Sequence, residues 1–324
     1  HRLGGHEAPP CIVSVFLGDL LTDILHEIET GGESNFREGG SLKIGLSSMP
    51  TLPQDVSDRN RTSPMAYTGN KFEFRMLGSS MSIADCNTVM NLMMCDVLSK
   101  IADRLEKCSD INAEVRDIIK DIMREHKRVI FNGNNYSREW VEEAERRGLP
   151  NITNSVDAFD AAIAEKNIAL FERFGVLTER ELKARYGIYH DNYVNTLNIE
   201  ALTMIEMSKR QILPAIISYT NFLSSSLNSL KETGLALDVS LQAGMLKDVT
   251  AAGVQFRANL SKLEKLVDKV KCESFESIKA RSVFYRDKIV PAMEALRETA
   301  DRLENLLGDK NWPIPTYTDL MFGE

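Results

Sequence analysis

Glu73 and Arg75 are two residues whose types and spacing could do chemistry. They alternate with Phe72 and Phe74 in the run FEFR, so a strand here would bury both aromatic rings on one face and point both charges to the other. A hard carboxylate such as Glu73 suits Mg²⁺, which takes oxygen ligands and usually keeps substrate phosphate oxygens in its coordination shell. The pattern therefore predicts one polar wall of a binding site.

Cations surround this strand in the sequence. Arg61 lies in the run RNRTSP, and Lys71 lies in the run GNKFEFR that also contains Arg75. Arginines bind phosphate or carboxylate in bidentate fashion, whereas lysine acts as a point charge toward phosphate. These residues predict that the site holds an anionic ligand near a metal ion.

A further carboxylate lies in the opening run HRLGGHEAPP. Glu7 follows Arg2 and two glycines, and it precedes a pair of prolines, so the run is interpreted as a rigid-ended loop that presents charge to a ligand. The simpler alternative is an ordinary surface turn. For Glu73 and Arg75 the corresponding alternative is a solvated strand face with an ion pair, favoured for any single residue by roughly two to one.

The three runs together narrow the choice. In this order, HRLGGHEAPP, RNRTSP and GNKFEFR resemble consecutive signatures of glutamine synthetase, specifically of its long type III form. The closing run WPIPTYTDLMF resembles the end of that type, and the segment LPNITNSVDAFDAAIAEKNIALFERFGVLTERELKARY is similar to the helical region that follows its catalytic sheet. The resemblance covers nearly the whole chain.

This resemblance implies an α+β fold. We expect residues 1–110 to form the C-terminal part of a catalytic domain built on a curved antiparallel sheet with helices, and residues 111–195 to continue that domain as helices. Residues 196–324 are expected to form a helical hairpin or bundle extension with a C-terminal tail that packs back across the catalytic domain.

The resemblance also implies an activity, the ATP-dependent ligation of ammonia to L-glutamate through a γ-glutamyl phosphate. The implied cofactor is Mg²⁺ or Mn²⁺, with ATP as co-substrate. The family further implies a cytoplasmic homo-oligomer of stacked rings with sites near the subunit interfaces. In such an enzyme the protein mainly positions the reactants and stabilises charge.

Roles for single residues follow from the same resemblance. Glu73 matches a metal-binding glutamate, Arg61 matches an arginine on the ATP phosphates, and Arg75 matches an arginine that contacts the substrate and the transferring phosphoryl group. Arg2 matches a glutamate-binding arginine. Glu7 matches the mobile-loop glutamate that helps to close the site and takes a proton from ammonium.

The sequence also departs from the family pattern. The stretch TSPMAY offers no cation where shorter forms of the enzyme have another arginine, and Lys71 is the expected substitute on the ATP phosphates. No His-x-His strand, no Glu-x-Glu metal pair of the family's kind and no N-terminal domain like that of the family occur in these residues. Because one carboxylate cannot hold the metal ions of this chemistry, we expect the chain to be about half of a longer polypeptide, and inactive alone.

Two other functions stay open at this stage. One is a nonenzymatic helical assembly module that carries a remnant synthetase site. The other is a different ligase or kinase that phosphorylates a carboxylate or guanidinium on a related sheet.

Composition bounds these readings. The 324 residues are 43% hydrophobic and 27% charged, enough for two domains with a substantial core. The net charge of −8 argues against nonspecific nucleic-acid binding, and no apolar run reaches the length of a membrane-spanning helix. The five cysteines show no metal spacing and no disulfide framework.

Helical periodicity begins near Asn87. The pattern predicts helices at 87–108, 112–130 and 138–147, two helices over 155–186 broken near Gly175, and a long helical region over about 195–310. Met90, Met93 and Met94 are predicted to fill a core. Pro214 is predicted to kink the first long helix.

Overall fold

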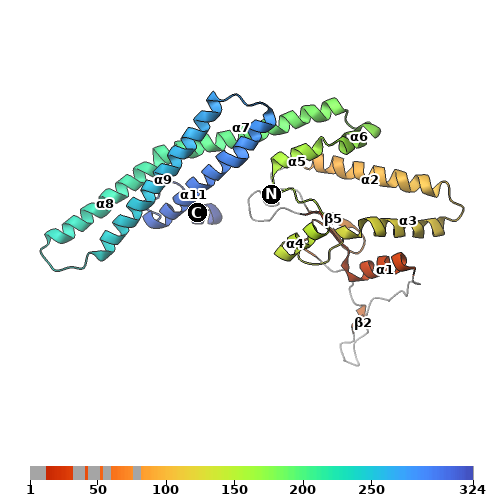
Figure 1. The fold of residues 1–324 in the computed structure, drawn as a ribbon. Helices are drawn as coiled ribbons and strands as arrows, with labels where there is room; N and C mark the ends of the chain where they lie inside the picture. The colour runs from red at the N-terminus through yellow and green to blue at the C-terminus, as the bar shows by residue number, and fades with distance from the viewer. Residues whose placement is uncertain (1–11, 32–40, 43–51, 54–59, 76–81, 324) are drawn as a thin grey trace. The chain divides into compact units, whose positions relative to one another are not determined.

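The computed structural model describes residues 12–31, 41–42, 52–53, 60–75 and 82–323 (Figure 1). The chain divides into two compact units. Unit 1 comprises His1–Ala158 and Ala164–Thr178, and unit 2 comprises Phe159–Ile163 and Glu179–Glu324. The predicted boundaries near residues 110 and 195 are a different division, and they stay a prediction.

The sheet of unit 1 is small and mixed. Strand β4 (Met65–Tyr67) lies in the middle, parallel to β1 (Val15–Phe16) and antiparallel to β5 (Phe72–Phe74). Two further short strands, β2 (Ser41–Leu42) and β3 (Leu52–Pro53), pair with each other in antiparallel fashion. The described strands are too short to test the curved sheet predicted above.

Helices make up most of the rest of unit 1, and side-chain caps fix where some of them begin. The Asp110 carboxylate accepts hydrogen bonds from two backbone N–H groups of α3, and the Ser137 hydroxyl accepts one from α4. Helices α1 and α3 pack against each other. The helices are α1 (Gly18–Thr30), α2 (Ala84–Leu105), α3 (Ile111–His126), the 3₁₀ turn η1 (Lys127–Val129), α4 (Arg138–Arg146), α5 (Ser155–Ala162), which enters unit 2, and α6 (Glu165–Arg173).

A hydrophobic cluster in unit 1 anchors α4. Trp140 is buried, and its ring stacks on Phe131 with the ring centroids 4.1 Å apart. Ile12, Ala144 and Leu149 are buried in the same cluster. The cluster fixes the loop between η1 and α4 beside the start of β1. Ile130 of this loop forms an isolated parallel β-bridge with Val15 of β1.

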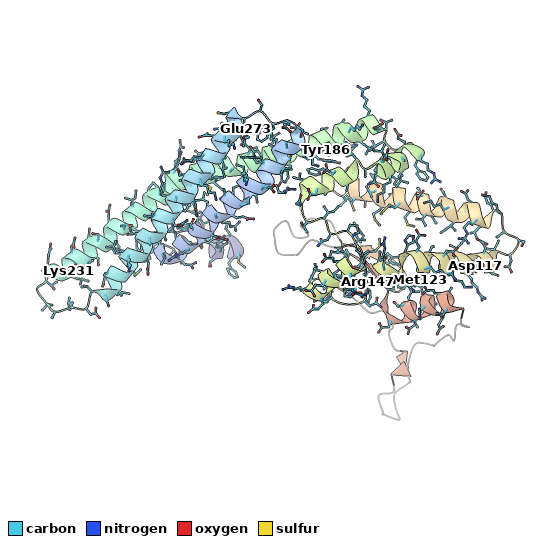
Figure 2. The ribbon with its side chains drawn as sticks, in the orientation of Figure 1. Asp117, Met123, Arg147, Tyr186, Lys231 and Glu273 are labelled. Atoms are coloured by element: carbon cyan, nitrogen blue, oxygen red, sulfur yellow. The ribbon has the colours of Figure 1, made fainter. Side chains whose placement is uncertain are left out.

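Unit 2 is a helical bundle in which α9 is the central helix. α9 (Ser240–Cys272) packs against both α8 (Leu213–Glu232) and α11 (Val290–Leu307). Helices α8 and α9 form a hairpin, and Lys231 near the end of α8 and Glu273 just after α9 lie at its opposite ends (Figure 2). The remaining helices are α7 (Glu179–Met207), α10 (Ile278–Phe284) and α12 (Tyr317–Phe322).

The apolar stripes read from the sequence of unit 2 form its core. Leu260, Leu263 and Val267 of α9 are essentially fully buried, as are Leu296 and Leu303 of α11. Because these residues recur every three or four positions, they line one face of each helix. In the structure the two stripes belong to one hydrophobic core.

Two prolines lie inside long helices of unit 2. Pro214 follows the π-helical turn η2 (Ser208–Ile212), and Pro291 follows the π-helical turn η3 (Tyr285–Ile289). Proline has no N–H and its ring clashes with the carbonyl one turn earlier, so a wider turn relieves both problems. A π turn thus precedes Pro214, and the predicted kink of the helix stays a prediction.

Three local expectations are wrong. Phe72 and Phe74 are 53% and 37% exposed on the edge strand β5, where Phe72 packs only against the ring of Tyr67, with the centroids 5.2 Å apart, among the ring pairs of the described residues. Met93 and Met94 are also exposed, because α2 buries only Leu92. A second break, between Ala162 and Glu165, divides the region 155–186 further than predicted.

The C-terminal tail was expected to pack back across the catalytic domain. Within unit 2, Trp312 is buried in the core and Ile314 packs against the same cluster, and the packing across the catalytic domain stays a prediction. Thr316 and Asp319 form a capping box at the start of α12, and the Tyr317 N–H donates to Glu304 of α11 at 3.2 Å.

No helix in the described part of the chain combines the length and apolar character that crossing a bilayer requires.

Leu263→Ala should destabilise the protein by about 2–5 kcal/mol, because it deletes fully buried methyl groups and leaves a cavity at the centre of unit 2. Leu241→Ala on the same helix is the matched control, since Leu241 is 68% exposed and should change the free energy of unfolding by less than about 0.5 kcal/mol. Denaturant unfolding measures both. Equal effects would contradict the proposed core.

His190 of α7 is a buried titratable group in unit 2. Its Nδ1 lies 2.8 Å from the Ser282 hydroxyl, and among the described residues its Nε2 has no hydrogen-bond partner. The ring packs edge-on against Phe159 and Tyr186. Burial lowers the pKa of His190, opposed by the negative charge of Asp160.

A pH dependence follows from this lowered pKa. The unfolded state binds the proton more readily than the folded state, so stability should be complete above the unfolded pKa of about 6.5 and should fall as pH decreases below it. His190→Gln should remove that part of the slope, whereas His126→Gln, at an exposed site, should leave it. Unfolding curves at a series of pH values test this, and identical slopes in both variants would refute it. The charged or titratable groups near His190 are Asp160, Tyr186, Asp191 and Lys279.

Candidate functional site

Four of the six predicted site residues lie in the described structure. Lys71, Glu73 and Arg75 lie on or beside β5, and Arg61 lies in the loop that leads into β4. Arg2 and Glu7 lie outside the described residues, so their roles stay predictions. The structure therefore tests how the strand and the loop are arranged.

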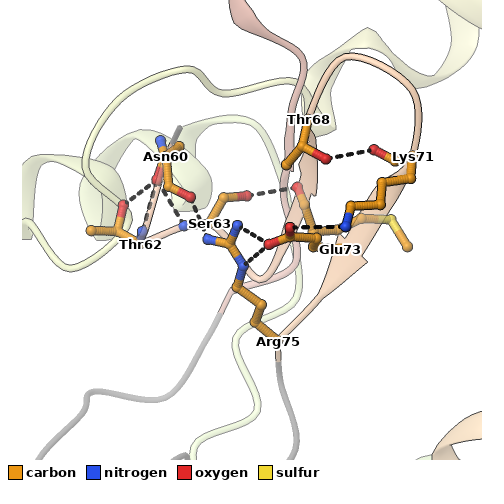
Figure 3. Close-up of polar contacts among 8 residues, drawn as sticks. Asn60, Thr62, Ser63, Thr68, Lys71, Glu73 and Arg75 are labelled. Atoms are coloured by element: carbon orange, nitrogen blue, oxygen red, sulfur yellow. Dashed lines mark hydrogen bonds and ion pairs between the residues drawn. The ribbon is translucent and has the colours of Figure 1, made fainter. Parts of the chain in front are cut away.

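Glu73 is flanked by cations on its own strand (Figure 3). Its carboxylate accepts hydrogen bonds from Arg75, at 2.6 Å from Nη2 and 3.2 Å from Nε, and lies 3.8 Å from the Lys71 ammonium. Residues two apart on a strand share a face, which is why these three side chains meet. The predicted polar face exists, and its carboxylate is ion-paired.

Arg75 links this strand to the loop that carries Arg61. Its guanidinium also donates to the backbone carbonyl of Asn60, and its backbone N–H donates to the carbonyl of Pro64 at 2.8 Å. Only 18% of the Arg75 side chain is exposed, so the guanidinium is fixed between loop and strand. The two sequence runs predicted to act together are therefore adjacent.

The Asn60 side chain shapes that loop. Its Oδ1 accepts hydrogen bonds from the backbone N–H groups of Thr62 and Ser63, at 2.8 and 3.0 Å, and from the Thr62 hydroxyl at 2.9 Å. This is a local Asx turn, in which a side-chain oxygen replaces a backbone acceptor. Arg61 lies within this turn, so Asn60 sets the path of the backbone that carries it.

A distant loop holds the turn from outside. The Asn60 Nδ2 donates to the carbonyl of Gly133 at 2.9 Å, and the backbone N–H of Asn135 donates to the Thr62 hydroxyl at 3.0 Å. Asn135 in turn accepts a hydrogen bond from the Ser14 hydroxyl beside β1. The segments around residues 14, 60 and 133 therefore form one polar network.

Asn132 extends the network to α1. Its Oδ1 accepts from the N–H groups of Leu17 and Gly18, both at 3.2 Å, and its Nδ2 donates to Thr22 at 3.0 Å. Gly18 has a φ of 76°, a left-handed conformation that suits glycine at this sharp turn. The sequence analysis did not single out the run FNGNNYS at residues 131–137, although its three asparagines were the available signal for this network.

Charge at the site is positive. Arg61, Lys71 and Arg75 contribute three cations against the carboxylate of Glu73. Arg61 is exposed, and no hydrogen bond or ion pair joins its side chain to the other described residues. An exposed guanidinium beside a paired one favours a ligand with phosphate or carboxylate groups.

The described residues do not by themselves fit a metal ion. No cluster of three or more His, Cys, Asp or Glu side chains with metal-binding geometry occurs among them, and the Glu73 carboxylate is paired with Arg75. The ion-paired strand face named above as the simpler alternative thus describes the observed geometry. Glu73 offers one hard oxygen donor, and its role as a metal ligand stays a prediction.

A family model of known proteins matches part of the chain. Residues 114–231, from α3 into α8, match the family model of the glutamine synthetase C-terminal domain. Residues 114–231 are therefore similar to that domain, and the resemblance seen in the sequence motifs is confirmed.

Individual relatives extend the match to 99% of the chain. The chain is 35% identical to a glutamine synthetase of Butyrivibrio fibrisolvens and 33% identical to a type-3 glutamine synthetase of Dictyostelium discoideum. It is 31% identical to a glutamine synthetase of Bacteroides fragilis. The matches cover 46%, 44% and 45% of these relatives. The chain thus spans about half the length of the curated relatives it matches.

Asn60→Ala should expose the backbone N–H groups of Thr62 and Ser63, because their shared acceptor is removed. We expect hydrogen–deuterium exchange of the peptide around residues 60–67 to accelerate by about tenfold, equivalent to a lost hydrogen bond of about 1–2 kcal/mol. Asn60→Asp is the matched control, since it keeps the acceptor and loses only the donation to Gly133. Unchanged exchange in Asn60→Ala would show that the turn does not depend on this side chain.

Proposed function

We propose that this chain forms part of a glutamine synthetase, in which it supplies anion-binding groups on β5 and on the loop before β4. The observation that carries the proposal is the adjacency of Arg61, Arg75 and Glu73, in a chain similar to glutamine synthetases over 99% of its length. The overall reaction is the ligation of ammonia to L-glutamate with hydrolysis of ATP.

The reaction would proceed in two substitutions. A γ-carboxylate oxygen of glutamate attacks the γ-phosphorus of ATP, the bond to the bridging oxygen breaks, and ADP leaves. Ammonium loses a proton to give ammonia, which attacks the acyl carbon. The C–O bond to the phosphoryl group then breaks, and inorganic phosphate leaves with the electrons of that bond. Both steps gather negative charge on oxygens, which fixed cations stabilise.

The described side chains suit the first step. Arg75 is held between Asn60 and Glu73, so its guanidinium is positioned before a ligand arrives. Arg61 is exposed and would bind the ATP phosphates, with Lys71 as an added point charge. For the second step, we assign Arg2 to glutamate binding and Glu7 to removal of a proton from ammonium, following the family resemblance.

A metal ion would need ligands beyond those described. Glu73 would contribute one carboxylate to Mg²⁺ or Mn²⁺, and we propose that the remaining ligands come from elsewhere in a longer polypeptide. The chain matches only 44–46% of the length of its relatives, which leaves room for such a part. Residues 1–324 alone are accordingly proposed to be inactive.

Assembly and location complete the proposal. We propose a cytoplasmic homo-oligomer of stacked rings, with unit 2 contributing to contacts between subunits. Exposed apolar side chains such as Ile199, Ile217 and Phe222 on α7 and α8 support a role in packing between chains. The same residues would also support a nonenzymatic assembly module, and the experiments below separate the two.

Arg75 and Glu73 can be tested in the complete protein. Arg75→Lys should lower kcat/KM for ATP by roughly a hundredfold. Lysine keeps the charge but cannot donate hydrogen bonds to the Asn60 carbonyl and the Glu73 carboxylate at the same time. Glu73→Gln should weaken metal-dependent ATP use while keeping the shape of the side chain. Glu125→Gln, at a side chain that is 77% exposed, is the control and should retain full activity.

The outcomes separate the candidate functions. Normal activity in Arg75→Lys and Glu73→Gln would remove both residues from the site. A complete protein without any glutamine synthesis would favour the assembly module. Glutamine synthesis by residues 1–324 alone would refute the proposal that ligands from elsewhere complete the site.

A further inference from the structure

A short segment around the end of helix α5 is held to unit 2 by tertiary contacts. Residues Phe159–Ile163 belong to unit 2, whereas Ala158 before them and Ala164 after them belong to unit 1. The rest of unit 2 begins only at Glu179. Because neither flanking residue belongs to unit 2, the contacts of Phe159–Ile163 with other helices keep this segment, here called the strap, in place.

Phe159 is the apolar anchor of the strap. Its ring stacks on Tyr189 of α7, with the ring centroids 5.7 Å apart. It also packs edge-on against His190 and Tyr193 of the same helix, at 5.0 and 6.3 Å. Aromatic pairs in these geometries stabilise a contact beyond the area that they bury. The ring of Phe159 therefore holds the strap against α7.

Asp160 is the polar anchor of the strap. Its carboxylate accepts a hydrogen bond from the Tyr186 hydroxyl of α7 at 3.0 Å and another from the Lys279 ammonium of α10 at 2.5 Å. Hydrogen bonds to charged groups are stronger than those between neutral groups. The strap is thus fastened to two helices of unit 2.

His190 is in contact with both anchors. Its ring packs against Phe159 and also against Tyr186, the residue that donates to Asp160, with the centroids of His190 and Tyr186 4.4 Å apart. The residue is fully buried. A neutral imidazole is tolerated in such surroundings, whereas a charged one loses its hydration. The charge of His190 therefore bears directly on whether the strap can stay docked.

The hydrogen bonds of His190 show where a second proton would go. The Ser282 hydroxyl donates to the Ile278 carbonyl at 3.3 Å, so at 2.8 Å it accepts from Nδ1 of His190, which carries the proton of the neutral ring. Nε2 is then a buried nitrogen with no partner among the described residues. Protonation would add a donor there without an acceptor, which disfavours the docked arrangement.

The charges that face His190 act in opposite directions. Burial disfavours the protonated ring most strongly, and the Lys279 ammonium also disfavours it, while the carboxylates of Asp160 and Asp191 favour it. The net effect lowers the pKa of His190. Water reaching the ring would remove the largest of these effects.

The neighbouring titratable groups keep their charge in mildly acidic solution. Burial raises the pKa of Tyr186 and that of Tyr193, so both hydroxyls stay neutral. Burial alone would raise the pKa of Asp160, but the hydrogen bonds from Lys279 and Tyr186 lower it further, so its carboxylate stays ionised. Of His190 and these three neighbours, His190 is the group that changes charge near pH 6.5.

We propose that the strap is a pH-sensitive latch, in which protonation of His190 releases Phe159 and Asp160 from α7 and α10. Release lets water reach Nε2 and accept its new hydrogen. The docked state binds the proton less readily than the released state, whose pKa is about 6.5. Docking is therefore complete above that pH and weakens as pH falls below it. The latch does not depend on the reaction proposed above.

Hydrogen–deuterium exchange of the complete protein tests the latch. In a peptide covering residues 155–163, the protection factor should fall by up to about tenfold between about pH 7.5 and 5.5, the ratio expected for a released pKa of about 6.5. Protection there should also be lower than in residues 256–267 of α9, because opening the strap leaves the core of unit 2 folded. Equal protection of both peptides, or protection of the strap that is constant with pH, would overturn the proposal.

Substitution of the histidine tests its part in the latch. His190→Gln should keep the strap protected to the same degree at both pH values, because the amide is not protonated in this range. His126→Gln, at a side chain that is 56% exposed, is the matched control and should retain the fall of up to about tenfold. A full fall in His190→Gln would show that another group controls the strap.

The linkage can also be measured in reverse, with His190 intact. Phe159→Ala weakens docking, so it should raise the pKa of His190 toward about 6.5, measured from the pH dependence of the slow exchange of the imidazole C2 hydrogen. Phe322→Ala, at a ring that is 74% exposed, should leave that pKa unchanged. An unchanged pKa in Phe159→Ala would overturn the proposal, and this test decides it if His190→Gln does not fold. Unfolding curves confirm that each variant is folded.

Discussion

The side-chain amide of Asn60 is the interaction on which the candidate site depends. It ties its own loop into an Asx turn through Oδ1 and binds the distant loop at Gly133 through Nδ2. The carbonyl of the same residue accepts from Arg75. One residue thus joins the loop, the edge strand and the loop before α4, and each of these bonds satisfies a polar group that would otherwise need water. The cations of the site are positioned because this junction exists.

In unit 2, apolar contacts between helices take the place of the polar network found around Asn60. α9 is buried along one face by α8 and α11, and its stripe of leucines and valines needs no polar partner. Where prolines interrupt the helices, π turns absorb the irregularity before Pro214 and before Pro291. The bundle therefore stays continuous while carrying two wide turns. Ser208 and Ile212 of η2 line a cavity of about 230 Å³ in unit 2, so the same irregularity that accommodates Pro214 also shapes a concave surface.

The sequence predicted the parts of this protein that depend on periodicity and on local motifs. Stripes such as Leu260 and Leu263 are buried, and the period of two on β5 placed Glu73 and Arg75 on one face. It failed where the outcome depends on which surface a neighbour covers. Phe72 and Met94 have the character of core residues, yet each is 53% exposed. The asparagine network was also missed, because bonds between residues 60 and 133 leave no periodic signal.

The state of Glu73 bears on how such a site could work. A carboxylate bonded to Arg75 at 2.6 Å is already neutralised, so it gains less from a cation than a free carboxylate would. Binding a metal at Glu73 would require the guanidinium to turn toward another anion. A phosphate provides one, and Arg75 would keep its bond to the Asn60 carbonyl during that exchange. If the proposed function holds, the metal and the phosphate would favour each other's binding through a single shared arginine. The coupling requires no movement of the strand, because Lys71, Glu73 and Arg75 share one face of β5 from the start.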